Sequence, residues 1–393
     1  MPSRLYLIAC CAMLVFGVVL GLPGTVLGLP ETVAELGLTL TSRGTLISAL
    51  FVGLLVGCLL SGAVVDALGY RASLALSLGL VAMAMPLLAM ARTAVLAGTA
   101  IAALGVAAAG VNTASNALSS EFFPGERARR MNRLAVLAGI GGLTMPVAVS
   151  LSSAGVSWRT IVVTGGALSG VLALACAWVP SPMSPAPVHH SLRDAIRRFA
   201  GQPGFGWLGL ALLLGGGNEA ALAGWISTFV QTAGFSASAA TWVLASHWLG
   251  LILSRVLLSP RIERVKAAAI VRSAIAGAVC VAAFVVAGAR EWLAAGPFII
   301  GFAIALVVPT TLALSGDRHP GNTGALFGLL LTLVQVGGIA LPSTIGFVSD
   351  RAGLRPGLSV VILSYLCVAV LVRLALRADR VESGSTLRRP HDS

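Results

Sequence analysis

Charge is what this sequence has least of. Charged residues make up 10% of the chain and residues of the apolar set make up 57%, whereas about 25% of the residues in a soluble domain are charged. So few charges cannot cover the surface of a soluble protein. The composition therefore excludes a soluble enzyme or binding domain, and it predicts a chain that lies mostly within a lipid bilayer.

Other common signals are absent as well. The six cysteines all lie within apolar stretches, where they pack as small hydrophobes, so no disulfide framework is predicted. Segments of about ten residues with alternating polarity, which are typical of a membrane barrel, are missing. A glycine-rich phosphate-binding loop is missing too, so ATP-driven transport is not supported. We therefore expect an all-α membrane protein with no cofactor and no metal site.

What the sequence does have is a repeated apolar pattern. A membrane-spanning helix needs about 20 mainly apolar residues, and a polar interruption at 181–203 divides the segments of this kind into six and six. The expected fold is an all-α polytopic membrane protein of two six-helix bundles, over 1–180 and 204–378, with a tail over 379–393. The twelve predicted spans are 5–29, 43–65, 72–92, 95–118, 131–154, 158–178, 205–232, 240–258, 267–288, 292–314, 323–347 and 357–377.

Basic residues concentrate at alternate ends of the predicted helices. If the N-terminus is cytoplasmic, most of the 26 lysines and arginines lie on the inner side, which satisfies the positive-inside rule. Membrane orientation and lipid headgroups therefore explain the net charge of +12, and no nucleic acid is expected as a partner. We expect a monomeric, multi-pass protein of the cell (inner) membrane with both termini in the cytoplasm.

One carboxylate, Glu219, lies in the middle of a predicted membrane helix. An ionisable group at the bilayer centre costs a few kcal/mol, so one that is present there is expected to face a cavity. Its place about fifteen residues into segment 205–232 puts it near the midplane, because a helix rises about 1.5 Å per residue. Glu219 is therefore predicted to bind a solute or to carry a proton. The preceding Gly215, Gly216 and Gly217 favour a bend in this helix over simple packing.

Several other polar or aromatic residues are candidates for the same cavity. Asn112 and Asn116 are spaced to share one helix face, and an amide suits sugar hydroxyls because it both donates and accepts. Hydrogen bonding between helices is an equally good reading of such amides. His247 could relay a proton or simply pack, and a tryptophan could stack on a sugar ring or anchor a helix at the interface. The full candidate set adds Asn218, Trp225 and Gln335.

Two loops carry one motif. Between the second and third predicted helices, glycine, aspartate, glycine and arginine stand at the spacing of the signature loop of the major facilitator superfamily, in Gly62, Asp66, Gly69 and Arg71. This resemblance implies the major facilitator fold and a gating role for these residues at the inner helix ends, with the first glycine letting two helices touch. A second match lies after the eleventh helix, on the outer side by the helix count, in Gly346, Asp350 and Arg351. At the equivalent position after the eighth helix Arg255 is present without an aspartate.

A wider resemblance narrows the family to one branch. The seventh and eighth predicted helices resemble those of the fucose/galactose/glucose:proton symporters, in Gly217-Asn218-Glu219 and Ser254-Arg255. The resemblance implies an alternating-access carrier of a small-molecule solute, with sugars as the substrate class and a proton as the coupled ion. The first predicted helix lacks the acid that such symporters often carry. Proton-driven efflux of drugs or metabolites is the alternative, and a polytopic membrane enzyme is a remote one.

The predicted topology can be tested by labelling single cysteines in whole cells. Positions near Arg193 and Arg388 should be protected from a membrane-impermeant thiol reagent, because the linker and the tail are expected inside. Positions near Ser236 and Gly353 should react. Labelling of the linker from outside would contradict the topology.

Overall fold

The computed structural model describes residues 2–123, 127–151, 156–180, 197, 204–258, 266–286, 290–318 and 323–386. Apart from residue 197, the predicted linker lies outside these described residues. The described chain consists of helices, namely α1 (Pro2–Val26), α2 (Pro30–Leu36), α3 (Leu40–Ala89), α4 (Ala94–Phe122), α5 (Arg127–Leu151), α6 (Trp158–Ala177), α8 (Phe205–Thr232), α9 (Ala237–Leu258), α10 (Lys266–Val286), α11 (Arg290–Ile304), α12 (Val307–Arg318), α13 (Thr323–Ala352) and α14 (Leu354–Thr386).

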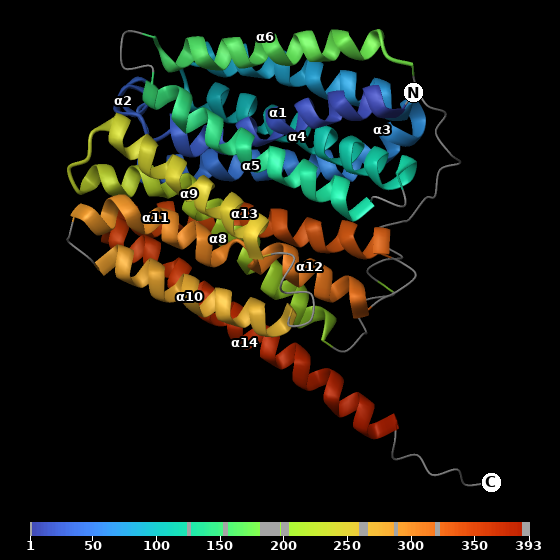
Figure 1. Ribbon diagram of the computed structural model, residues 1–393. Helices are drawn as coiled ribbons and strands as arrows, with labels where there is room; N and C mark the ends of the chain where they lie inside the picture. The colour runs from blue at the N-terminus through green and yellow to red at the C-terminus, as the bar shows by residue number, and fades with distance from the viewer. Residues whose placement is uncertain are drawn as a thin grey trace.

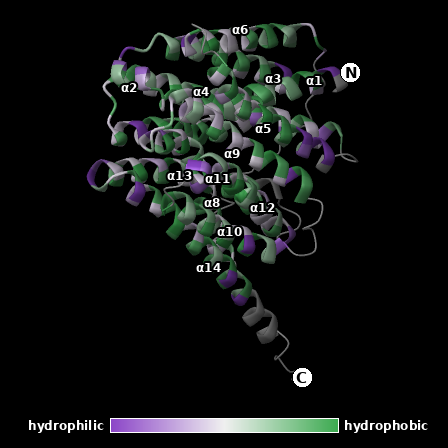
Figure 2. Cartoon of the chain, turned by 60° about the vertical axis from the view of Figure 1, so that its left-hand side comes forward, coloured by the Kyte–Doolittle hydropathy of each residue, from purple (hydrophilic) through white to green (hydrophobic). Residues whose placement is uncertain are grey.

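The membrane-spanning character of these helices agrees with the prediction. Ten helical segments of the described chain are long and apolar enough to cross a membrane, and α11 and α12 together form one of them. One of the ten, α3, contains two predicted spans, and α8 falls outside the ten because its glycines, Asn218 and Glu219 lower its hydropathy. Figure 2 shows hydrophobic colour along the helices and hydrophilic colour mostly near their ends. The chain is thus an all-α polytopic membrane protein.

The long helix α3 is divided at one glycine. Gly69 has φ 76° and ψ 168°, which is not a helical conformation, and the helix axis breaks there. A side chain would make this positive φ unfavourable, whereas glycine adopts it at little cost. The break separates the second and third spans, as the sequence predicts.

The helices form two groups that follow the order of the chain. Helices α1 to α6 lie together in the upper part of Figure 1, and α8 to α14 lie together in the lower part. The two groups meet where α3 packs against α13 and where α5 packs against α9. Any site between the groups is therefore lined by helices from both halves of the sequence.

The two groups are in close contact at the end of the molecule that carries α2, here called the α2 end. Small residues permit this contact: a Cβ added to Gly24 would lie 1.9 Å from the carbonyl oxygen of Ala223, and one added to Gly44 would lie 2.5 Å from that of Pro342. Ser48 also donates to the carbonyl oxygen of Ile339 at 2.6 Å. The α2 end is therefore closed by direct backbone contact between the groups.

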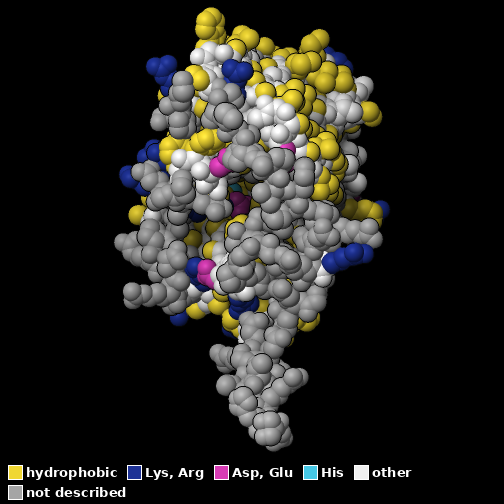
Figure 3. Space-filling model, turned by 90° about the vertical axis from the view of Figure 1, so that its right-hand side faces the viewer, with side chains coloured by type: hydrophobic (Ala, Val, Ile, Leu, Met, Phe, Trp, Pro, Cys, Tyr) yellow, Lys and Arg dark blue, Asp and Glu magenta, His cyan; other side chains and the backbone are white. Residues whose placement is uncertain are grey.

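The opposite end, here called the linker end, has a different character. Two hydrogen bonds there join helices of the same group, from Tyr70 to Glu121 and from Arg71 to the carbonyl oxygen of Val179. Figure 3 looks onto this end and shows the surface hollowed near its centre, with acidic side chains visible. The protein is thus closed at the α2 end and hollowed at the linker end.

The close approach at Gly24 predicts a specific effect of Gly24→Ala. The added methyl group would collide with the backbone of Ala223, so the groups should separate at the α2 end. We expect a longer distance between spin labels placed at the exposed Ala34 and Ala352, measured by double electron–electron resonance. Gly79→Ala is the control, because nothing lies within 4 Å of a Cβ at Gly79. Equal distance distributions in both variants would contradict the prediction.

Candidate functional site

Glu219 is paired with an arginine inside the membrane-spanning region. The terminal nitrogen Nη2 of Arg255, on α9, donates to Oε1 of Glu219, on α8, at 2.8 Å. Each side chain is 24% exposed, so the pair faces an accessible space and is not sealed within the bundle. Opposite charges that lie this close offset much of the cost of holding each charge in the bilayer. The predicted cavity residue is therefore one half of an ion pair.

Arg255 is held by a second acceptor that a proline makes available. Its Nε donates to the carbonyl oxygen of Ala305 at 3.3 Å. In a regular helix that oxygen would accept from the backbone N–H four residues later, but Pro309 has no N–H. The chain is not helical at residues 305 and 306, between α11 and α12. The helix break thus supplies an uncharged anchor for the guanidinium group.

The residues next to this pair in the sequence carry buried polar atoms that have no hydrogen-bond partner in the described chain. Both side-chain atoms of Asn218 and the Oγ of Ser254 are buried without a hydrogen bond. His247 is fully buried; its Nδ1 lies 3.1 Å from the carbonyl oxygen of Pro297, while Nε2 has no partner. Unused hydrogen-bonding capacity at this depth is typical of a functional site.

The helix is not broken at the glycines before Glu219. The backbone of α8 is helical throughout residues 205–232. Gly217 lies against the backbone of Gly337, where an added Cβ would be 2.6 Å from the carbonyl oxygen, and Gly216 lies against Val334. The structure shows no break at these glycines, and they allow close packing of α8 on α13. The broken helix near the site is the one at Ala305.

The remaining candidates for the cavity are distributed over several helices. On α4, Nδ2 of Asn116 donates to the side-chain oxygen of Asn112 at 2.8 Å, so the two amides share a face as predicted. Gln335 on α13 is half-buried, with its side-chain oxygen unpartnered. Trp225 is fully buried and donates from Nε1 to the carbonyl oxygen of Pro342 at 3.3 Å. In this conformation Trp225 belongs to the contact between the groups and not to an accessible wall.

The second motif closes the α2 end. The two carboxylate oxygens of Asp350, at the end of α13, accept from the backbone N–H groups of Leu40 at 3.0 Å and Thr41 at 2.8 Å. Those N–H groups belong to the first turn of α3, where the helix dipole favours a negative charge. Gly346 lies one turn earlier, against the carbonyl oxygen of Leu40. By contrast, Arg351 bonds to Phe347 of its own helix, so it does not take part in the contact.

The first motif lies at the linker end. Asp66 is exposed, Gly69 provides the chain break, and Arg71 bonds to the end of α6. Gly62 is exposed, and no atom of the described residues lies within 4 Å of a Cβ at that position. The expectation that Gly62 lets two helices touch is therefore not met in this conformation, in which the linker end is hollowed.

One buried cation was not predicted. Arg43 is only 8% exposed, and its Nη2 donates to Oγ1 of Thr228 across the two groups. Its guanidinium lies 5.8 Å from the ring of Trp225, and its Nε has no partner. The sequence gives little indication of this burial, because Arg43 lies at the start of a predicted span, where an arginine is expected at the membrane interface.

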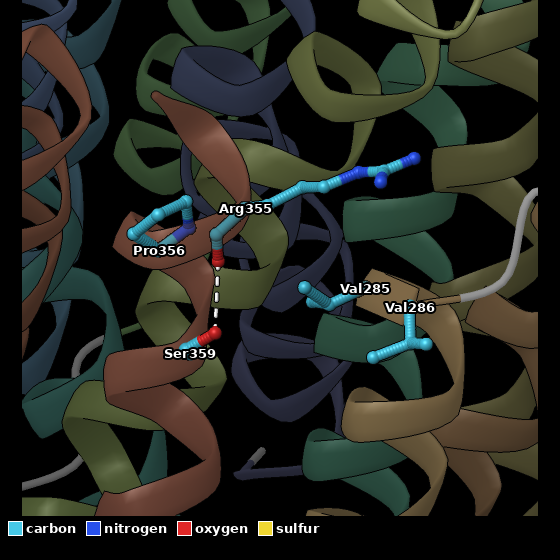
Figure 4. A pocket seen from close by; sticks show the side chains of 5 residues that line it. All are labelled: Val285, Val286, Arg355, Pro356 and Ser359. Carbon is cyan, nitrogen blue, oxygen red and sulfur yellow. Dashed lines mark hydrogen bonds between the residues drawn. The ribbon is translucent and has the colours of Figure 1, made fainter. Parts of the chain in front are cut away.

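A pocket elsewhere in the molecule lacks the features of a solute site. It has a volume of about 490 Å³ and is lined by Val285, Val286, Arg355, Pro356 and Ser359. Figure 4 shows these side chains where α10 ends and α14 begins, at the α2 end. A single arginine among mainly apolar walls does not provide convergent polar groups, so the ion pair is the better candidate.

The structure is thus a polytopic membrane protein of two packed helix groups, with a partly exposed ion pair between α8 and α9 of the second group. The sequence profile of the Major Facilitator Superfamily matches residues 5–342, and the chain belongs to this family. No protein of curated function matches the chain.

Solved transporter structures share the fold at low sequence identity. The nucleoside transporter NupG has a TM-score of 0.74 and 16% identity over 95% of this chain and 99% of its own. The E. coli fucose:proton symporter FucP has a TM-score of 0.66 and 17% identity, over 94% and 98%. The human organic anion transporter TETRAN has a TM-score of 0.67 and 19% identity, also over 94% and 98%. The fold is therefore that of a secondary transporter, and these neighbours do not determine the substrate.

Asp350→Asn should favour opening of the α2 end. The amide keeps the shape of the carboxylate but loses its charge at the start of α3, so we expect the open fraction to rise about two- to fivefold. The measurement is the rate at which a buried cysteine, Ser48→Cys, reacts with a thiol reagent in a background without native cysteines. Arg351→Gln is the control, and equal rates in the two variants would contradict this role of Asp350.

Proposed function

We propose that this protein moves a small polar solute, with sugars as the first class to test, between the two groups of helices. The observation that carries the proposal is the Glu219–Arg255 ion pair, which faces an accessible space within the membrane helices. A transporter site needs polar groups near the midplane that reorganise when a solute arrives. Glu219 and Arg255 meet this need, with Asn112, Asn116 and Gln335 as further candidate contacts.

Alternating access would require the α2 end to open and the linker end to close. The contacts at Asp350 and at Gly24 join the groups at the α2 end. Breaking them while the linker end closes would expose the site to the other side. We assign the gate at the α2 end to Gly346 and Asp350, and the gate at the linker end to Gly62, Asp66, Gly69 and Arg71.

Glu219 is also proposed to carry the coupled proton. Protonation removes its negative charge and so weakens its attraction to Arg255. The site then has two states, with Glu219 either charged or protonated, and coupling to a proton gradient requires two such states. In this scheme the protein lies in the cell membrane. The positive-inside rule then predicts that the linker end faces the cytoplasm.

Glu219→Gln should separate proton coupling from solute binding. Glutamine keeps the shape and the hydrogen bond to Arg255 but does not titrate, so accumulation driven by a pH gradient should fall to the level of passive equilibration. Exchange of labelled for unlabelled solute should continue. The assay is uptake into, and release from, proteoliposomes with a panel of labelled sugars, with and without an imposed pH gradient.

Other outcomes of this assay have clear meanings. If the Gln variant accumulates solute as the wild type does, Glu219 is not the proton carrier. If a pH gradient drives solute in the opposite direction, the protein exports its solute against proton entry. If affinity falls equally with and without the gradient, Glu219 acts as a ligand only.

A further inference from the structure

Arg255 remains in place when Glu219 is neutral. Its hydrogen bond to Ala305 is with a backbone oxygen, which has no charge to lose and is freed by Pro309. A protonated Glu219 would therefore leave a fixed guanidinium group in the site, with its terminal nitrogens available. Arginine stays charged under these conditions, so the site would carry one uncompensated positive charge.

Charge balance decides which solute suits such a site. In the structure Glu219 and Arg255 balance one another. A neutral sugar bound together with a proton would leave the charge of Arg255 without a counter-charge among the membrane-spanning helices, which is unfavourable. A solute with one negative charge, bound together with one proton, restores neutrality. Both the empty and the loaded site then have no net charge when the protein changes conformation.

A second cation, Arg43 at the contact between the groups, also favours a solute with a negative charge. Arg43 lies nine-tenths buried at the closed α2 end, and its hydrogen bond is to a hydroxyl group. No ion pair joins Arg43 to an acid in the part of the chain that the structure describes. When the α2 end opens, this cation would border the route to Arg255. A route with two arginines and one titratable acid favours an anion.

We propose that the transported solute is a hydroxylated carboxylate, such as a sugar acid, and that its carboxylate takes the place of Glu219 as the partner of Arg255. The proposal rests on the function proposed above and specifies its substrate class. A proton binds to the carboxylate of Glu219, the Glu219–Arg255 contact opens, and the carboxylate of the solute accepts hydrogen bonds from the guanidinium group. Planar, two-point recognition of carboxylates is what arginine does best.

The test compares solutes that differ in one group. Binding of labelled D-glucuronate and D-glucose, and of D-galacturonate and D-galactose, is measured with the purified full-length protein by equilibrium dialysis between pH 5.5 and 8. For the wild type we expect the acid of each pair to bind more tightly than the neutral sugar, and to bind more tightly as the pH falls. Glu219→Gln should bind the acid at least about tenfold more tightly than the wild type at pH 8, without pH dependence.

Variants of the arginine and of its anchor complete the design. Arg255→Gln should weaken binding of the acid by about 30-fold or more, while Arg272→Gln, which removes an exposed arginine of α10, should bind like the wild type. Pro309→Ala keeps both charges but returns an N–H to the helix, so it should compete for the Ala305 oxygen and weaken acid binding severalfold. This variant tests the anchor even if changes at Glu219 impair folding.

The outcomes separate this inference from the function on which it rests. If neutral sugars bind as well as their acids, and Arg255→Gln binds them normally, the anionic substrate class is wrong while sugar transport stands. If neither acids nor neutral sugars bind, both the substrate class and the proposed sugar transport are wrong. Binding of the acids that is unchanged in Arg255→Gln overturns the role of Arg255.

Discussion

The ion pair between Glu219 and Arg255 is the interaction on which the rest of the arrangement depends. Each charge alone would be costly within the membrane helices, and the pairing offsets part of that cost for both residues. The pair joins α8 to α9, and the break at Ala305 gives Arg255 a second acceptor. A single protonation then changes the balance of the whole site.

Small residues make the change of shape possible. Glycines at the α2 end bring backbones of the two groups into direct contact, as at Gly24 and Gly44. Such surfaces can separate and meet again without repacking a core. Asp350 adds a directional contact, because a carboxylate at the start of α3 is favourable only when α13 is docked. Closure is thus specific but not costly to reverse.

The sequence predicted part of the site and missed the rest for physical reasons. Glu219 was recognisable because its charge interrupts an apolar run, which is a local property. Arg255 was recognised only as part of a motif. Its partner Glu219 lies on another helix, and sequence spacing does not predict contacts between helices. Pro309 was a visible signal for the helix break, but the glycines before Glu219 drew the prediction to the wrong helix. Arg43 gains its role only from neighbours on another helix.

The sequence by itself determined the class of the protein. Its scarcity of charge, its recurring apolar spans and the glycine at the break in α3 are local consequences of a hydrocarbon solvent and of backbone sterics. Only the tertiary structure decided which end is closed, which acid meets which base and which glycines pack against which backbone. These features depend on helices far apart in the chain being brought together, and a bilayer permits many pairings of similar apolar helices, among which packing selects one.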